Sequence, residues 1–109
     1  MENMRVVFMV ETKTSPELDK KFNDWDANVH IPLALKGPGM IKARRYKSVD
    51  PGSDEGVYLV IYELEDESVI KTYEKSPERK AAHQKMLDDW GEGGFSVNWA
   101  GYFKKLPKK

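Results

Sequence analysis

The alternation of apolar and polar positions predicts four β-strands along the chain. Residues 5–12 (RVVFMVET) are dense in β-branched and large apolar side chains, which indicates a short strand buried on both faces. Residues 57–64 (VYLVIYEL) predict the clearest strand, because both of its faces are apolar. Residues 40–49 and 95–106 predict two more strands, of which the first is the more polar. Strict alternation along the last strand places five residues on one face: Phe95, Val97, Trp99, Gly101 and Phe103.

A first helix is predicted between the first two strands, over residues 15–35. It begins with a serine N-cap followed by proline at the first helical position. Its apolar stripe has helical spacing and consists of Leu18, Phe22, Trp25 and Val29. Pro32 and the glycines at 37 and 39 are expected to close this helix, because proline lacks the amide donor and glycine admits turn conformations.

A second helix is predicted over residues 66–90, with a joint at Ser76 and Pro77 that restarts it with a new N-cap. The element order is therefore strand, helix, strand, strand, helix, strand. Right-handed crossovers place both helices on one face of a four-stranded antiparallel sheet, which is the ferredoxin-like βαββαβ arrangement of an α+β protein. We expect one domain over residues 1–109.

Two helices cover only one face of such a sheet. We expect the uncovered face to include Tyr58, Val60 and Tyr62, which would form a large exposed apolar patch on a monomer. A second copy packed sheet on sheet about a two-fold axis would cover this patch, so the pattern predicts a homodimer. A monomer with an exposed aromatic face is the alternative.

Composition narrows the function classes. The 18 basic and 18 acidic side chains cancel, so no global charge favours nucleic acid or an anionic membrane as a partner. No apolar run approaches the roughly 20 residues of a membrane span, and the pattern of the first residues leads us to expect no secretory signal. The absence of cysteine excludes disulfides, thiolate nucleophiles and cysteine-ligated metals. We expect a cytoplasmic protein.

His30 is the first candidate for chemistry, because it lies near the predicted end of the first helix, just beside the apolar stripe. Histidine titrates near neutral pH, which suits proton transfer. Asp26 lies four residues earlier on the same side of the helix and could fix the tautomer of the imidazole. The alternative is that His30 only caps the helix end or bonds a loop carbonyl.

The strands supply further candidates. Arg44 and Arg45 are adjacent on a strand, so their side chains point to opposite faces of the sheet. One of them could reach the cavity and bind a carboxylate or phenolate, and the alternative is a surface arginine that pairs with an acid. Tyr58 and Tyr62 share a face and either present hydroxyls to a cavity or serve only in sheet packing.

Aromatic and histidine residues near the C-terminal end complete the candidates. Trp99 and Phe103 are expected to form an aromatic wall of the cavity. His83 follows the apolar stripe of the second helix, so we expect it to be a core or edge residue rather than part of the site.

The chain resembles the EthD-like members of the dimeric α+β barrel superfamily over nearly its whole length. In these proteins a helix ending in a tryptophan-or-tyrosine, histidine, proline pattern is followed by proline-glycine and an arginine-tyrosine strand. The matching residues here are Trp25, His30, Pro32, Leu33, Pro38, Gly39, Arg45 and Tyr46. In several resembling isomerases the histidine at this helix end is an acid–base residue, and the resemblance implies that role for His30.

The superfamily hosts isomerases, ring cyclases, cofactor-free oxygenases, haem enzymes and proteins of unknown role, so the fold alone does not determine the function. The leading hypothesis is a cofactor-free isomerase, cyclase or lyase that acts on an aromatic or conjugated carbonyl compound. His30, Tyr62 and Asp26 would be catalytic. The expected substrate-binding residues are Trp25, Arg45, Tyr58, Trp99 and Phe103.

Two alternatives stay open: a cofactor-independent monooxygenase in the same pocket, and a non-catalytic dimeric binding protein whose cavity is filled or closed. The sequence contains no Gly-rich phosphate loop and no His-Glu-x-x-His motif. Asp26 and His30 supply only two potential metal ligands, and two ligands are not a site. We therefore expect no metal. The superfamily includes haem enzymes with a histidine axial ligand, but net neutrality and the few basic residues near His30 lead us to expect no haem.

Overall fold

The structure of the chain, a computed structural model, describes residues 5–51, 56–91 and 93–107. Its strands are β1 (Val6–Thr14), β2 (Met40–Lys47), β3 (Val57–Leu64) and β4 (Phe95–Lys104). Its α-helices are α1 (Asp19–Trp25), α2 (Ile31–Ala34), α3 (Ile70–Glu74) and α4 (Pro77–Trp90). A π-helical segment, Asp26–His30, joins α1 to α2, and short 3-10 turns (Pro16–Leu18 and Glu67–Val69) precede α1 and α3. Within these described ranges, no helix is long and apolar enough to span a lipid bilayer.

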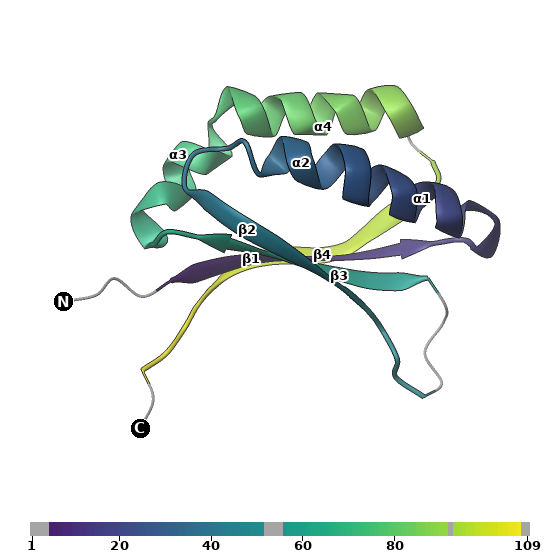
Figure 1. The fold of residues 1–109 in the computed structure, drawn as a ribbon, viewed down its shortest axis with the longest axis horizontal. Helices are drawn as coiled ribbons and strands as arrows, with labels where there is room; N and C mark the ends of the chain where they lie inside the picture. Colours follow the sequence, from purple (N-terminus) through teal and green to yellow (C-terminus); the bar gives the residue numbers. More distant parts are fainter. Residues whose placement is uncertain (1–4, 52–55, 92, 108–109) are drawn as a thin grey trace.

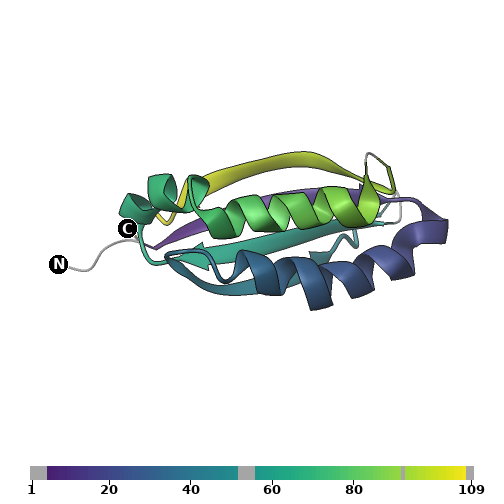
Figure 2. The same ribbon diagram turned by 90° about the horizontal axis from the view of Figure 1, so that it is seen from above.

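The four strands form one antiparallel sheet in the order β2-β3-β1-β4. The helices α1, α2 and α4 lie together across one face of this sheet and leave the other face uncovered (Figures 1 and 2). This arrangement confirms the predicted ferredoxin-like α+β fold. β3 has the predicted bounds, and the other three strands differ from the prediction by a few residues.

The prediction for the faces of β3 is wrong. Tyr58, Val60 and Tyr62 lie beneath the helices and are at most 6% exposed, whereas Val57, Leu59 and Ile61 belong to the uncovered face. Both faces of this strand are apolar, so the pattern alone could not orient it. The helix-covered side also offers polar groups of α1 to a tyrosine: the hydroxyl of Tyr58 donates to Asp19 and accepts from Asn23.

The uncovered face of the sheet is nevertheless apolar. β3 contributes Leu59 and Ile61, and the register places Tyr46 of β2 beside Leu59. On β4, Trp99 and Phe103 are aligned with the outward residues of β1 and are 41% and 50% exposed. The face therefore carries aromatic and aliphatic residues with two charged ones, Glu11 and Arg44, among them. Exposed apolar surface of this kind marks interaction sites.

The first helical region ends at Leu35, as predicted, and Pro32 lies inside it. A proline inside a helix removes one hydrogen bond and its ring collides with the carbonyl four residues earlier. The π turn of Asp26–His30 ends two residues before Pro32, and the amide of Ile31 donates to the carbonyl of Asp26, which widens the helix at this point. The buried residues of the combined helix are accordingly spaced by four, five and three: Phe22, Asp26, Ile31 and Ala34.

The joint in the second helical region is confirmed. The hydroxyl of Ser76 accepts a hydrogen bond from the amide of Arg79 at 3.1 Å and donates one to the carbonyl of Tyr73 at 2.7 Å. Pro77 occupies the first turn of α4, where its missing amide hydrogen costs nothing. This joint places Tyr73 at the end of α3 next to Arg79 at the start of α4.

Candidate active site

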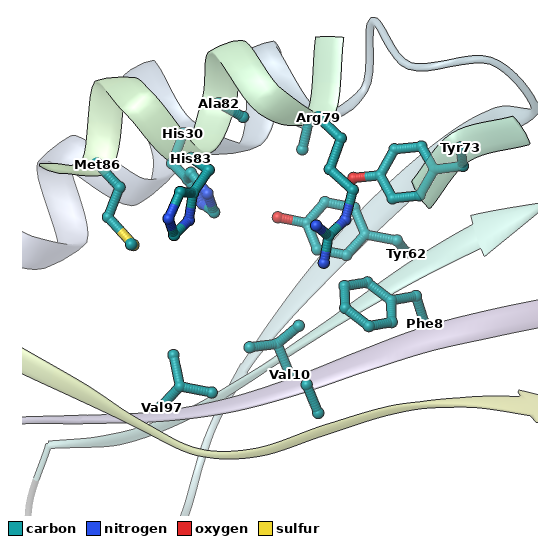
Figure 3. A pocket seen from close by; sticks show the side chains of 12 residues that line it. Phe8, Val10, His30, Tyr62, Tyr73, Arg79, Ala82, His83, Met86 and Val97 are labelled. Carbon is teal, nitrogen blue, oxygen red and sulfur yellow. The ribbon is translucent and has the colours of Figure 1, made fainter. Parts of the chain in front are cut away.

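A cavity of about 260 Å³ lies between the helix-covered face of the sheet and helices α2 and α4 (Figure 3). Its apolar walls come from the strands on one side and from the helices on the other. The apolar lining residues are Phe8, Val10, Val97 and Ala100 of the sheet with Ala34, Ala82 and Met86 of the helices. Three of these seven are alanines, and their small side chains leave the space that the cavity occupies.

Five polar side chains also line the cavity: His30, Tyr62, Tyr73, Arg79 and His83. Both tyrosines are only 3% exposed, and burial raises the pKa of each phenol, so both hydroxyls stay protonated and can donate. The hydroxyl of Tyr62 is directed toward the middle of the cavity (Figure 3). Neither hydroxyl has a hydrogen-bond partner among the described residues, so both are available to a ligand.

His30 is the last residue of the π segment, and its Nδ1 lies 3.3 Å from Oδ1 of Asp26, a long hydrogen bond. The carboxylate of Asp26 is 3% exposed and also accepts a hydrogen bond from Nε of Arg45 at 3.0 Å. A carboxylate beside Nδ1 favours the tautomer in which Nδ1 carries the hydrogen. Nε2 of His30 is then the nitrogen that can accept a proton from a ligand in the cavity.

Trp25, predicted to bind substrate, does not line the cavity. Its indole stacks on the imidazole of His30, with ring centroids 4.9 Å apart and planes inclined by 13°. Its Nε1 donates to Oδ2 of Asp89 on α4 at 2.7 Å. Trp25 therefore positions His30 and ties the first helix to α4.

Arg45 and Tyr58 also lie outside the cavity lining, although both face the helices. Besides its contact with Asp26, Arg45 donates from Nη2 to Oδ1 of Asn23, and Asn23 donates in turn to the hydroxyl of Tyr58 at 3.0 Å. These residues form a polar chain along the sheet side of α1 that ends at His30. They lie behind Asp26 and are not among the residues that line the cavity.

Trp99 and Phe103 were expected in the cavity wall, and the structure contradicts this. Both lie on the uncovered face of the sheet, opposite His30. The register shifts between Glu11 and Thr12 of β1, and this bulge interrupts the alternation along β4. Val97 therefore faces the helices while Trp99, two residues later, faces away from them.

His83 was expected to be a core or edge histidine, but it lines the cavity together with His30. Tyr73 and Arg79, which also line the cavity, were not predicted as site residues. The sequence of one helix does not show which other elements that helix packs against. The small residues Ala34 and Ala82 were the available signal, because alanine at buried positions of two facing helices leaves room between them. In the part of the chain that the structure describes, no group of three or more His, Cys, Asp or Glu side chains could hold a metal ion.

Comparisons with known proteins agree with this architecture. Residues 5–98 match the model of the family described as Domain of unknown function (DUF4286). No curated protein matches the chain.

Solved structures share the fold at low sequence identity. An ethyl tert-butyl ether D (EthD) family protein from Bacillus halodurans is 16% identical with a TM-score of 0.68, over 93% of this chain and 99% of that one. SnoaB, a cofactor-independent oxygenase from Streptomyces nogalater, is 12% identical with a TM-score of 0.62, over 96% of each chain. HapK from Hahella chejuensis is 11% identical with a TM-score of 0.66, over 97% of this chain and 96% of that one. The chain therefore belongs to the DUF4286 family and has the ferredoxin-like α+β barrel fold of the EthD-like proteins.

Proposed function

We propose that the chain is an enzyme that moves a proton on a small aromatic or conjugated carbonyl compound without a cofactor. The observation that carries this proposal is the pairing of His30 with Asp26 at the wall of a cavity that also contains the free hydroxyl of Tyr62. A non-catalytic binding protein was expected to have a filled or closed cavity. The open, partly polar cavity favours the enzyme instead.

The proposed reaction begins at a carbon next to a carbonyl group. Nε2 of His30 removes a proton from this carbon, and the electron pair of the C–H bond moves toward the carbonyl oxygen to give an enolate. The hydroxyl of Tyr62 donates a hydrogen bond to that oxygen, in surroundings where apolar walls strengthen the interaction. A positioned base contributes about 10²- to 10⁴-fold to such a step. Return of the proton to a different carbon completes an isomerisation, and loss of a leaving group completes an elimination.

A cofactor-independent monooxygenase is the second candidate. SnoaB, which has this fold, is a cofactor-independent oxygenase. The same deprotonation by His30 would produce an electron-rich carbanion whose carbon bonds to dioxygen to give a hydroperoxide. Loss of water from this hydroperoxide breaks the O–O bond and leaves a carbonyl on that carbon, so the substrate itself supplies the electrons. The two candidates thus share their first step and differ in whether dioxygen is consumed.

We also propose that the chain forms a homodimer through the uncovered face of the sheet. Leu59, Ile61, Trp99 and Phe103 lie on this face, and their burial at about 25 cal/mol per Å² would favour association. The cavity lies on the other side of the sheet, between it and the helices. Each copy would therefore contain a complete cavity.

Deuterium exchange tests the proposed first step without knowledge of the product. A panel of aromatic and conjugated ketones is incubated with the protein in D2O, and NMR measures deuterium incorporation next to the carbonyl. We expect exchange with the wild-type protein and its loss in His30→Gln, while Arg44→Gln on the uncovered face remains active. Exchange that is equal in His30→Gln and wild type would remove His30 from the reaction. Oxygen uptake during turnover would favour the monooxygenase over the isomerase, cyclase or lyase.

A further inference from the structure

The end of the cavity formed by the joint between α3 and α4 contains a cation, Arg79. Arg79 is the one permanently charged side chain among the described residues that line the cavity, and none of them is acidic. Its Nε lies 3.3 Å from Oε2 of Glu74, a carboxylate that also accepts a hydrogen bond from the hydroxyl of Tyr102. The terminal nitrogens of Arg79 make no hydrogen bond to a described residue, and the guanidinium projects from α4 toward the sheet (Figure 3).

Arg79 is held in this position by its surroundings. Its backbone amide donates a hydrogen bond to the hydroxyl of Ser76, the N-cap of α4. This bond fixes the first turn of the helix and therefore the side from which the Arg79 side chain projects. Its guanidinium carbon lies 6.0 Å from the ring centroid of Tyr73, within the range of a cation–π contact. The Arg79 side chain is 39% exposed, so the cation sits at the mouth of the cavity rather than in its depth.

Free hydrogen-bond donors gather around this guanidinium. Tyr73 and Tyr62 are both buried, and their hydroxyls face the cavity without a partner among the described residues. A buried donor without a partner costs about 1–3 kcal/mol, so an oxygen ligand that satisfies it is favoured. The planar guanidinium and a neighbouring hydroxyl match the two oxygens of a carboxylate.

The remaining walls fit a flat apolar body. Phe8 forms part of the floor and stacks on Tyr102, with ring centroids 4.6 Å apart. Val10, Val97 and Met86 continue this apolar surface toward the two histidines. Drug-sized ligands occupy cavities of about 300–1,000 Å³, so a cavity of about 260 Å³ fits a single substituted ring.

We propose, on the basis of the substrate cavity proposed above, that its ligand is a small aromatic carboxylate whose anionic group binds Arg79 and the hydroxyl of Tyr73. The ring lies over Phe8, and the reacting substituent points toward His30. Arg79 thereby selects the substrate by charge and sets its direction in the cavity. His83, one helical turn after Arg79 on α4, lies beside the reacting end (Figure 3).

A matched pair of probes tests this assignment. Benzoate and benzamide have nearly the same shape and differ in charge, and NMR titration measures the affinity of each for the full chain. We expect benzoate to bind at least about tenfold more tightly, because a charge-assisted hydrogen bond contributes about 1.5–3 kcal/mol. Arg79→Gln should reduce the affinity for benzoate to that for benzamide, and Arg79→Lys should restore part of it. Arg44→Gln, which removes an arginine from the opposite face of the sheet, should bind both probes as the wild type does.

Three results would overturn the assignment: equal affinity for the two probes, unchanged benzoate binding in Arg79→Gln, or no binding of benzoate to the wild type. Thermal unfolding of each variant confirms that it is folded. The outcome is separable from that of the proposed reaction. Benzoate binding that needs Arg79, with no deuterium exchange on any ketone, would contradict the reaction and keep the anion site. Deuterium exchange that needs His30, together with equal affinity for benzoate and benzamide, would support the reaction and contradict the anion site.

Discussion

The imidazole of His30 lies nearly parallel to the indole of Trp25, with centroids 4.9 Å apart and an angle of 13° between the planes. Asp26 holds the Nδ1 edge of the same imidazole. One face and one edge of the His30 ring are therefore fixed by residues of its own helix. Changes to either neighbour should alter how His30 works without removing the imidazole.

Replacing Trp25 with leucine should lower the rate constant of proton exchange with little change in substrate affinity, because the stack orients the base and does not contact the cavity. A misplacement of the base by about 1 Å can cost about 10²-fold in rate. Trp25→Phe is the matched control, since it keeps an aromatic face and loses only the hydrogen bond to Asp89. Exchange kinetics at several ketone concentrations separate the two parameters. A Trp25→Leu variant with a wild-type rate constant would show that the stack has no part in positioning His30.

Replacing Asp26 with asparagine should both disturb the tautomer of His30 and destabilise the fold. The carboxylate is buried against Arg45, and removing one partner of such a pair costs about 3–5 kcal/mol. Arg45 is partly exposed, so we expect a loss of about 3 kcal/mol in the free energy of unfolding. Chemical denaturation measures this loss, and long-range nitrogen–hydrogen NMR spectra report which ring nitrogen carries the hydrogen.

The double variant Asp26→Asn with Arg45→Met supplies the control for that measurement. It removes both charges, so it should be more stable than Asp26→Asn alone. If the loss of unfolding free energy in the double variant equals the sum of the losses in Asp26→Asn and Arg45→Met, the Asp26–Arg45 pair is not coupled. The polar chain behind His30 would then have no energetic role.

Acid should weaken the fold through Asp19. The hydrogen bond from Tyr58 lowers the pKa of the Asp19 carboxyl, as do contacts with Thr14, Lys47 and Asn23, while burial opposes them. A carboxyl whose pKa is depressed in the folded state adds stability above its unfolded value of about 3.9, and this stability is lost as the pH falls through the folded pKa.

Tyr58→Phe removes the largest of these contributions. We expect the variant to lose about 1–2 kcal/mol of unfolding free energy near pH 7, and the difference from wild type to shrink as the pH falls below about 4. Urea unfolding at a series of pH values measures both effects. Tyr62→Phe is the control, because the hydroxyl of Tyr62 has no partner among the described residues and its loss should not depend on pH in this range. A pH-independent loss in Tyr58→Phe would contradict the assigned cause.

Placing a charge on the uncovered face of the sheet should separate the proposed dimer. Ile61 lies near the middle of β3 and faces away from the helices, so Ile61→Asp would bury a carboxylate in the interface. We expect the wild type to sediment at twice the mass of the chain at low micromolar concentration, and the variant at the mass of one chain. Lys80→Asp on α4 is the surface control. A wild-type protein that sediments as a single chain would contradict the dimer.

Much of the fold could be predicted from the sequence because local signals agreed with it. The serine and proline at 76 and 77 mark the joint between α3 and α4, and the dense apolar run at 57–64 marks β3. These signals depend on residues that are neighbours in the chain. The position of His30 near a helix end, four residues after Asp26, was predictable for the same reason.

The features that were missed depend on contacts between distant segments. Both faces of β3 are apolar, so only packing against α2 determines that Tyr62 points inward. The bulge opposite Thr12 reverses the outward and inward positions of β4, and no residue of β4 alone indicates it. The cavity is formed by residues from seven elements, and the cation that Arg79 places at one end of it could not be recognised from any one of them.

The π segment before Pro32 makes the spacing of residues along the first helix a determinant of the site. A π turn holds one residue more than an α-helical turn, so it rotates everything after it by about 100° relative to a regular helix. Ile31 and Ala34 reach the core, and His30 reaches the cavity, only with this extra residue in place. In a related chain with one residue more or fewer between Phe22 and Pro32, a different side chain would therefore face the cavity. The other elements of the fold would be unchanged. The side chain that lines the cavity at this position is therefore set by the number of residues in the helix as much as by which residues they are.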